Sequence, residues 1–190
     1  MSNDVRQKVR DAAVPLFARK GVKATTVKDI ARAAGVSEGA LYRHWASKED
    51  LAADLFAAEY TALSQALREA AGEGPAPDRL RRVVGWAFQL AEAGPDRARF
   101  LLLAQHDGLP LVPDGQETPV DVVCAIVGDG IAEGSLRATD REVLAHMVIG
   151  AIVMNVQSQV YGRQKAPLGT LAATVADALL NGMVGKGAES

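Results

Sequence analysis

An all-α fold of about nine helices is predicted from three features of the sequence. Apolar residues recur every three to four positions through most of the chain, as at Val9, Ala12 and Leu16, which is typical of amphipathic helices. Segments with the alternation typical of strands are almost absent. Apolar residues also make up 48% of the 190 positions, enough for a substantial core.

The helix boundaries follow from caps, glycines and prolines. Pro15 predicts a kink in the first helix, because a proline inside a helix removes a hydrogen bond and crowds the preceding turn. Residues 107–119 hold several prolines and glycines, which predicts an irregular segment. The expected helices span residues 5 to about 21, 27–34, 38–45, 48 to about 70, 79 to about 91, 95–103, 120–131, 139 to about 159 and 168 to about 184.

Composition predicts a cytoplasmic protein. Cys124 is the only cysteine, so an internal disulfide is excluded, as suits a reducing compartment. No uninterrupted apolar run approaches the roughly 18 residues of a membrane span. The charged amino terminus lacks the apolar segment of a secretory signal. We therefore expect neither a membrane span nor a secretory signal.

Charge is divided unevenly along the chain. Residues 1–50 hold ten Lys and Arg and six Asp and Glu side chains, a net charge of +4, whereas residues 51–190 carry −6. A basic end beside an acidic remainder favours contact between that end and a polyanion.

A helix-turn-helix pattern lies inside the basic end. Gly35 supplies the turn between two short helices, Val36 follows as an apolar plug, and Ser37 can cap the second helix. In this arrangement the second helix projects from the surface and enters a DNA major groove, which is about 12 Å wide.

The residues around this turn extend the pattern. The relevant runs are residues 16–21 (LFARKG), 25–31 (TTVKDIA), 34–37 (AGVS), 39–45 (GALYRHW) and 47–51 (SKEDL). In combination they resemble the tetracycline-repressor (TetR) family of bacterial regulators. The resemblance covers about the first third of the chain; the remainder is similar in helical layout, with a local likeness at residues 133–137. Pro15 departs from the family pattern.

The resemblance implies a role for each matching position. The helix at 38–45 would be the recognition helix, with Glu38, Gly39 and Arg43 reading bases and Thr26, Tyr42, His44 and Lys48 contacting phosphates. Arginine binds guanine through two hydrogen bonds, and glutamate accepts one from cytosine. The nine residues predicted to contact DNA are Thr26, Lys28, Ser37, Glu38, Gly39, Tyr42, Arg43, His44 and Lys48.

Several of these residues have a simpler explanation. Tyr42 would also fit a role in closing the core beneath the first helix, and His44 a packed histidine with satisfied hydrogen bonds. Glu38 also suits a solvated helix start, where a carboxylate interacts well with the helix dipole. Lys28 and Arg32 fit a solvated face as well as a phosphate contact.

The rest of the chain is expected to bind a ligand and to dimerise. The resemblance implies a cavity enclosed by the fourth to seventh helices and pairing of the last two helices across a two-fold axis. The helix at 143–160 is apolar around most of its circumference, which fits burial on two sides, in a dimer or deep in a monomer. The residues predicted to line a pocket for an apolar or aromatic ligand, unless they are plain core, are Trp86, Phe88, Phe100, Leu103, His106, Met147, Met154, Asn155 and Tyr161.

An enzyme is the main class that the sequence disfavours. It has no phosphate-cradling glycine loop and no G-x-S-x-G motif, and no ligand spacing accompanies His106 or His146, so neither metal nor cofactor is expected. The prediction is a DNA-binding domain at 1–47 and a ligand-binding and dimerisation domain at 48–190, with the helix at about 48–70 linking them. The protein would be a homodimeric repressor that binds double-stranded operator DNA and is released by a small-molecule effector. An activator, a co-ligand-dependent regulator and a helical protein-interaction module are the alternatives.

Overall fold

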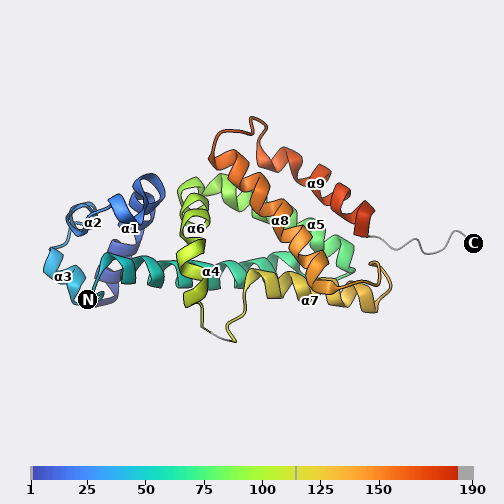
Figure 1. Cartoon of the computed structure of the whole chain (residues 1–190), viewed down its shortest axis with the longest axis horizontal. Helices are drawn as coiled ribbons and strands as arrows, with labels where there is room; N and C mark the ends of the chain where they lie inside the picture. The colour runs from blue at the N-terminus through green and yellow to red at the C-terminus, as the bar shows by residue number, and fades with distance from the viewer. Residues whose placement is uncertain (1, 114, 184–190) are drawn as a thin grey trace, which may run out of the picture. The chain divides into compact units, whose positions relative to one another are not determined.

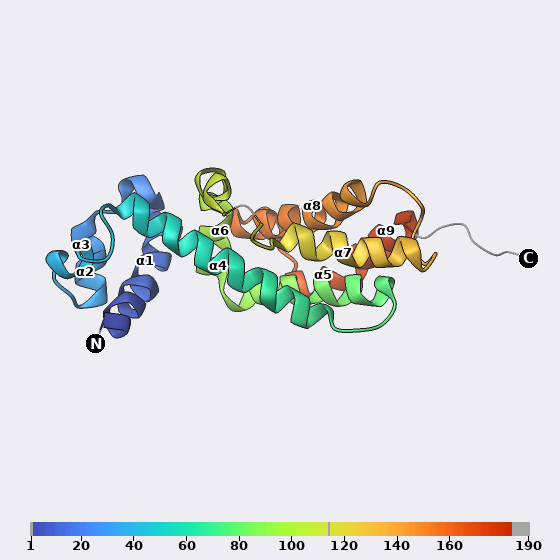
Figure 2. The ribbon, with the colours of Figure 1, turned by 90° about the horizontal axis from the view of Figure 1, so that it is seen from below.

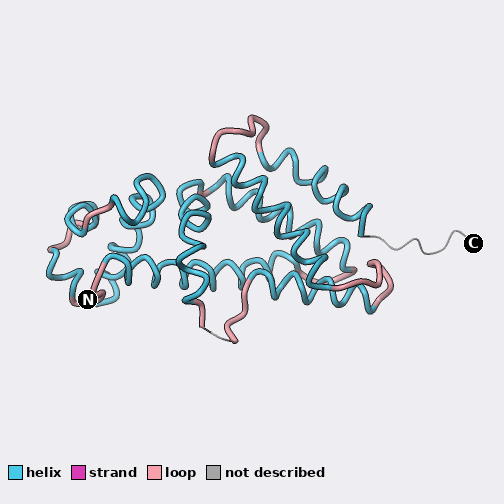
Figure 3. The backbone as a smooth tube through the Cα atoms, viewed as in Figure 1, coloured by secondary structure: helices cyan, strands magenta, loops and turns pink. Residues whose placement is uncertain are grey.

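The computed structural model describes residues 2–113 and 115–183 (Figure 1). In this part of the chain there are nine α-helices, one short 3-10 helix and no strand, so the predicted all-α class is confirmed. Figure 3 shows helix and loop along this part of the chain. The helices are α1 (Ser2–Ala24), α2 (Val27–Ala34), α3 (Glu38–Tyr42), α4 (Lys48–Ala71), α5 (Ala76–Ala93), α6 (Pro95–Gly108), η1 (Leu109–Leu111), α7 (Pro119–Ala132), α8 (Arg141–Val160) and α9 (Leu168–Met183).

The chain divides into two compact units. The amino-terminal unit comprises Met1–Tyr60 and Gly94–Gln116, and the carboxy-terminal unit comprises Thr61–Ala93 and Glu117–Ser190. Helix α4 supplies residues to both units, and α6 returns to the amino-terminal one. The predicted functional boundary after residue 47 stays a prediction.

Aromatic packing forms the core of the amino-terminal unit. The buried ring of Phe17 in α1 stacks on that of Phe100 in α6, with 6.0 Å between their centroids. Leu41 and Trp45 are buried in the same cluster as Leu55 of α4. The two residues that anchor the short α3 region therefore share one core with α1, α4 and α6.

Aliphatic side chains form the core of the carboxy-terminal unit. Within it, α5 packs against α9, α7 packs against α8 and α8 also contacts α9; Figure 2 shows α7 beside α8. Val83 and Phe88 of α5, Ile126 of α7 and Val148 of α8 are buried. An ion pair between Arg81 and Asp177 joins α5 to α9 at the surface.

Some helix boundaries differ from the sequence predictions. The helical torsions of α1 are interrupted at Gly21 (φ 77, ψ 161), where the first helix was predicted to end, because glycine adopts positive φ without steric cost, but α1 continues to Ala24. Helix α3 ends at Tyr42, not at residue 45. Helix α6 and η1 extend to residue 111, into the segment predicted to be irregular. In this segment Gly108 packs closely on Phe56, since an added Cβ would lie 2.4 Å from the ring. Residue 184, the expected end of the last helix, lies outside the described residues.

Helix α8 is long and apolar enough, by length and composition, to cross a membrane. Its mean hydropathy is 1.5 although polar residues interrupt its apolar ones. The hydropathy stays high because most of these polar residues are uncharged. Only 22% of the apolar window is buried within the chain. Such a helix has apolar surface left to cover.

Two glycines of α7 provide a test of the packing in the carboxy-terminal unit. A Cβ at Gly130 would lie 2.7 Å from the Cβ of Ala76 and 2.6 Å from Leu136, whereas a Cβ at Gly128 would meet nothing within 4 Å. We expect Gly130→Ala to lower the free energy of unfolding by about 1–3 kcal/mol through overpacking. Gly128→Ala should raise it by about 0.5–1 kcal/mol, because alanine is the better helix former. Urea denaturation of both variants measures this, and equal effects would contradict the packing described.

Candidate nucleic-acid interface

Helix α2 begins at a capping box. The Asp29 amide donates to the Thr26 hydroxyl oxygen (3.1 Å), and the Thr26 amide donates to the Asp29 carboxylate (3.3 Å), as the sequence predicted. These hydrogen bonds from the Thr26 side chain and backbone hold the pKa of Asp29 below its ordinary value. The cap satisfies amides that would otherwise lack partners at the start of the helix.

The turn between α2 and α3 has the geometry that its sequence predicts. Gly35 adopts the left-handed conformation (φ 67), and the Val36 amide donates to the Ala31 carbonyl at 3.0 Å. Ser37 then caps α3, since its hydroxyl oxygen accepts from the Ala40 amide at 3.2 Å. Ala40 is buried with Leu41, so the opposite side of α3 faces outward.

The exposed side of α3 carries the residues predicted to read DNA. Tyr42 is 52% exposed, so the explanation that it closes the core beneath the first helix is wrong. His44 is half-buried, with its ring centroid 5.6 Å from that of Trp45. The predicted DNA contacts that are exposed are Thr26, Lys28, Ser37, Glu38, Gly39, Tyr42 and Arg43.

Basic side chains on this surface are available for phosphates. Among the described residues, no ion pair engages Lys28, Arg32 or Arg43, and all three are exposed. Lys20, by contrast, lies 3.8 Å from the Asp29 carboxylate. The unpaired cations supply a local positive potential beside α3.

Lys48 occupies a different position from the one expected for a phosphate contact. Its ammonium donates to the carbonyl oxygens of Lys23 and Thr25, each at 2.8 Å, and the side chain is mostly buried. A lysine at these carbonyls stabilises the end of α1, where they lack helical partners. The structure therefore places Lys48 in the support of the α1–α2 connection.

A network that the sequence analysis missed surrounds Trp45. Its indole Nε1 donates to Asp54 Oδ2 at 2.9 Å, and Arg10 donates to the same oxygen at 3.1 Å. The Arg6 guanidinium lies 5.6 Å from the centroid of the Trp45 ring, within cation–π range. The sequence did carry a chemical signal for the Trp45–Asp54 hydrogen bond. A buried tryptophan needs an acceptor for its N–H, and Asp54 is an acidic residue on the next helix.

Burial and hydrogen bonding act on Asp54 in opposite directions. Partial burial disfavours the charged carboxylate, but the hydrogen bonds from Trp45 and Arg10 outweigh this cost, so the pKa of Asp54 lies below its ordinary value. The carboxylate is therefore ionised at neutral pH and remains a strong acceptor.

The nine predicted pocket residues fall in different environments, and the pocket that they would form stays a prediction. Phe100 is in the core of the amino-terminal unit, which also contains Leu103 and His106, both exposed. Phe88 is buried and Trp86 half-buried in the carboxy-terminal unit. The three pocket candidates exposed on the carboxy-terminal unit are Met147, Met154 and Tyr161. The Asn155 amide donates to the Ala151 carbonyl of its own helix at 2.8 Å.

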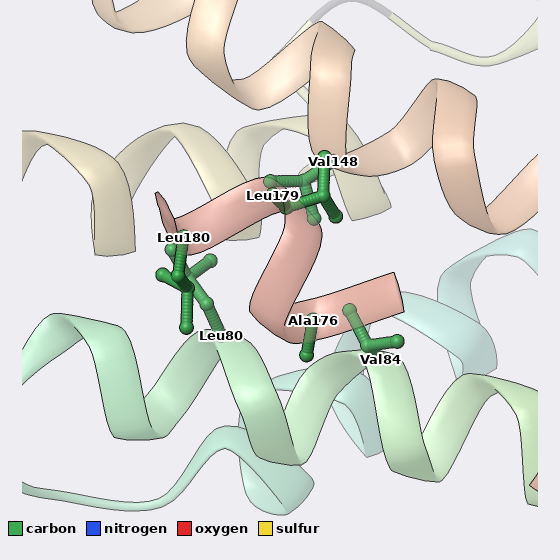
Figure 4. A pocket seen from close by; sticks show the side chains of 6 residues that line it. All are labelled: Leu80, Val84, Val148, Ala176, Leu179 and Leu180. Atoms are coloured by element: carbon green, nitrogen blue, oxygen red, sulfur yellow. The ribbon is translucent and has the colours of Figure 1, made fainter. Parts of the chain in front are cut away.

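A small apolar crevice lies instead between α5, α8 and α9. Figure 4 shows side chains from the three helices converging on it, and its empty volume is about 160 Å³. The lining is entirely aliphatic: Leu80, Val84, Val148, Ala176, Leu179 and Leu180. None of the nine predicted pocket residues is among them. In the described residues, no group of three or more His, Cys, Asp or Glu side chains could hold a metal ion.

Comparison with known proteins identifies relatives of the amino-terminal domain. Residues 9–55 match the family profile described as bacterial regulatory proteins, tetR family. The HTH-type transcriptional repressor KstR2 of Mycobacterium tuberculosis (strain ATCC 25618 / H37Rv) is 45% identical over 53 residues, which are 28% of this chain and 26% of that protein. The match thus spans about a quarter of this curated relative.

Other matches extend over nearly the whole chain. The fatty acid metabolism regulator protein of Bacillus subtilis (strain 168) is 26% identical over 182 residues, covering 93% of this chain and 94% of that protein. The crystal structure of the transcriptional regulator FadR from Bacillus subtilis in complex with stearoyl-CoA superposes with a TM-score of 0.84 at 24% identity. It covers 93% of this chain and 98% of that one. This likeness shows that the two chains share a fold.

The position of Lys48 leads to a testable expectation about stability. Lys48→Met removes the ammonium and leaves two carbonyl oxygens without their donor. We expect it to lower the free energy of unfolding by about 1.5–3 kcal/mol, the range for hydrogen bonds to charged groups. The control is Lys28→Met, at an exposed lysine, which should change stability by less than about 0.5 kcal/mol. A Lys48→Met protein as stable as the control in chemical denaturation would show that these hydrogen bonds contribute nothing.

Proposed function

We propose that this chain, which belongs to the TetR family of bacterial regulatory proteins through its amino-terminal helix-turn-helix domain, is a ligand-responsive transcriptional repressor. It binds pseudo-palindromic operator DNA as a homodimer in the bacterial cytoplasm. The observation that carries the proposal is the capped α2–turn–α3 arrangement, whose exposed face bears Glu38, Tyr42 and Arg43 inside the region that matches the family.

The DNA contacts divide by chemistry. Arg43 is exposed without an ion pair and is suited to bidentate contact with guanine, while Glu38 at the start of α3 accepts from cytosine. Gly39 allows close approach of the backbone, and a Cβ there would meet nothing within 4 Å. Tyr42 and Thr26, both exposed, donate to phosphate oxygens.

The remaining predicted DNA contacts are Lys28, Ser37, His44 and Lys48. Lys28 and His44 contribute phosphate contacts, and Ser37 lies next to the bases as the cap of α3. Lys48 acts first by holding the α1–α2 connection and reaches phosphate only if its ammonium leaves the two carbonyls it now binds. Repression then follows from occupation of the operator.

Helix α8 supplies the proposed dimer interface. Four large apolar side chains are exposed on it: Val143 (53%), Met147 (47%), Met154 (60%) and Tyr161 (48%). Their spacing of four and seven residues places them on one face of the helix, together with the exposed Gly150. Apolar stripes of this kind mark interaction sites, and a two-fold axis allows one copy to cover the same stripe on another. Helix α9 completes the interface by presenting small residues.

The proposed effector is a long-chain acyl-CoA thioester. This proposal is supported by the fatty acid metabolism regulator matched along 94% of its length, and by the stearoyl-CoA bound in the FadR structure. The all-aliphatic crevice between α5, α8 and α9 suits an alkyl chain better than an aromatic ring. The crevice includes space open to solvent and leaves no enclosed room for a ligand of this size, so binding requires these helices to move apart.

That movement is the basis of regulation. Two recognition helices in a dimer must lie about 34–36 Å apart to enter successive major grooves. A ligand that favours a widened carboxy-terminal unit shifts the population toward a state with another spacing, which weakens DNA binding.

DNA binding is tested with the DNA that flanks the gene and with a fragmented genomic pool. We expect sequence-selective retention by the wild-type dimer, with an affinity that falls steeply as salt rises, because phosphate contacts release counterions. Arg43→Ala should weaken binding to the selected duplex by roughly 5- to 150-fold, from the 1–3 kcal/mol of one bidentate base contact. Arg137→Ala, which removes the same charge from an exposed loop of the other unit, is the control. No selective retention of any DNA by a folded dimer would refute the proposal.

The dimer interface is tested by a charge on the α8 stripe. We expect Met154→Glu to convert the dimer to a monomer in light scattering, because a carboxylate buried at the two-fold axis faces its own copy. Leu103→Glu changes an equally large exposed side chain in the amino-terminal unit and should leave the dimer intact. A Met154→Glu protein that remains dimeric would place the interface elsewhere, and a monomeric wild type would refute the proposed homodimer.

A further inference from the structure

We propose that Asp54 is a positioning residue for operator recognition. Its carboxylate acts through Trp45 to fix the orientation of α3, and so of its exposed face, relative to the core. The proposal rests on the proposed function and concerns how its DNA-reading surface is held. It is carried by the hydrogen bond from Trp45 Nε1 to Asp54 Oδ2, 2.9 Å long.

Helix α3 cannot hold its own orientation. It has five residues, far fewer than an isolated helix needs for stability in water, so tertiary contacts must fix it. Leu41, fully buried, anchors it by apolar contact, which is non-directional. The indole–carboxylate hydrogen bond is directional and lies directly beyond the end of the helix, so it constrains rotation as well as depth.

The indole N–H of Trp45 depends on Asp54 as its hydrogen-bond acceptor. The side chain is only 4% exposed, so water does not readily replace Asp54 as a partner for the indole N–H. A buried donor without a partner is costly, and the ring would have to move to reach solvent. Arg43 lies two residues before Trp45 and Tyr42 three residues before it, so movement of the ring displaces both proposed DNA contacts.

Asp54 is itself held by a second donor. Arg10 of α1 donates to the same Oδ2 atom at 3.1 Å, and Arg6 lies over the Trp45 ring. The hydrogen bonds from Trp45 and Arg10 also keep the pKa of Asp54 low despite its partial burial, so the acceptor is charged at neutral pH. The Asp54 carboxylate of α4 therefore links Arg10 of α1 to Trp45, three residues after the end of α3.

Electrostatics and positioning make opposite predictions for the loss of this carboxylate. Removing a negative charge from the basic end strengthens attraction to any DNA. Loss of the anchor for Trp45 weakens only the binding that depends on the direction of α3. A comparison of selective with non-selective duplexes therefore separates the two effects.

The test uses the full chain with Asp54→Leu, Asp54→Asn and the control Asp96→Leu. Asp96 pairs with Arg19 at 2.8 Å in the same unit, so its loss changes the charge equally. The probes are the duplex selected from the flanking or genomic DNA and a random duplex of the same length. We expect Asp54→Leu to lose about tenfold or more in affinity for the selected duplex, as for one lost hydrogen bond to a charged group, with random-duplex binding unchanged or tighter. Asp54→Asn keeps a carbonyl oxygen as acceptor and should restore most of the selective affinity.

A second readout does not depend on DNA. In a Trp86→Phe background Trp45 is the remaining tryptophan, and its fluorescence reports the indole environment. We expect Asp54→Leu to shift its emission and increase quenching by acrylamide, and Asp54→Asn to change both less.

Three results would overturn the inference: an Asp54→Leu protein with the selective affinity of Asp96→Leu, an equal loss on both duplexes, or unchanged Trp45 emission. Failure of the proposed function has a different signature, because the wild type itself would then bind no DNA selectively. In that case the emission of Trp45 still decides whether Asp54 positions this segment.

Discussion

The constraint on which the DNA-reading surface depends is the shortness of α3. A five-residue helix has no stability of its own, yet its outer side must present side chains at defined positions. Burial of Leu41 and Trp45 in the aromatic core supplies the free energy, and the bond from Trp45 to Asp54 supplies direction. Lys48 stabilises the other side of the same region by holding the carbonyls at the end of α1.

The carboxy-terminal unit has the opposite character, because α8 leaves large apolar side chains exposed. Most of α8 is apolar, yet only 22% of its apolar window lies inside the chain. The crevice between α5, α8 and α9 is lined by aliphatic side chains alone. A second copy on α8 and an alkyl chain between the helices would each reduce the apolar area left in water. The proposed dimerisation and the proposed ligand response would thus have a common physical origin in this unit.

Local features were predicted from the sequence because their causes are local. The capping box at Thr26 and Asp29, the left-handed Gly35 and the cap at Ser37 each depend on residues within a few positions. The end of α3 was placed three residues too late, since its apolar spacing continues to Trp45 although the helix does not. The interruption of α1 at Gly21 fits the predicted end of the first helix near residue 21, because glycine leaves helical torsions without steric cost.

Hydrogen bonds between residues far apart in the sequence could not be predicted from local patterns. Asp54 meets Arg10 from 44 residues away, and Lys48 meets Lys23 from 25, and no periodicity reports such pairs. The predicted pocket residues fall in different environments for a related reason. Aromatic and methionine side chains at helical spacing fit both a core and a cavity, and only the packing shows that Phe100 belongs to the first and Met154 to an exposed face.

Hydrogen–deuterium exchange of the chain, free and bound to its selected duplex, tests the central claim most directly. If α2 and α3 form the DNA-binding surface, peptides spanning residues 26–50 gain protection in the complex, and a random duplex protects them less. Peptides from α8 should exchange alike in both states, because the proposed dimer exists before DNA binds. Protection confined to the carboxy-terminal unit, with residues 26–50 unchanged, would contradict the account.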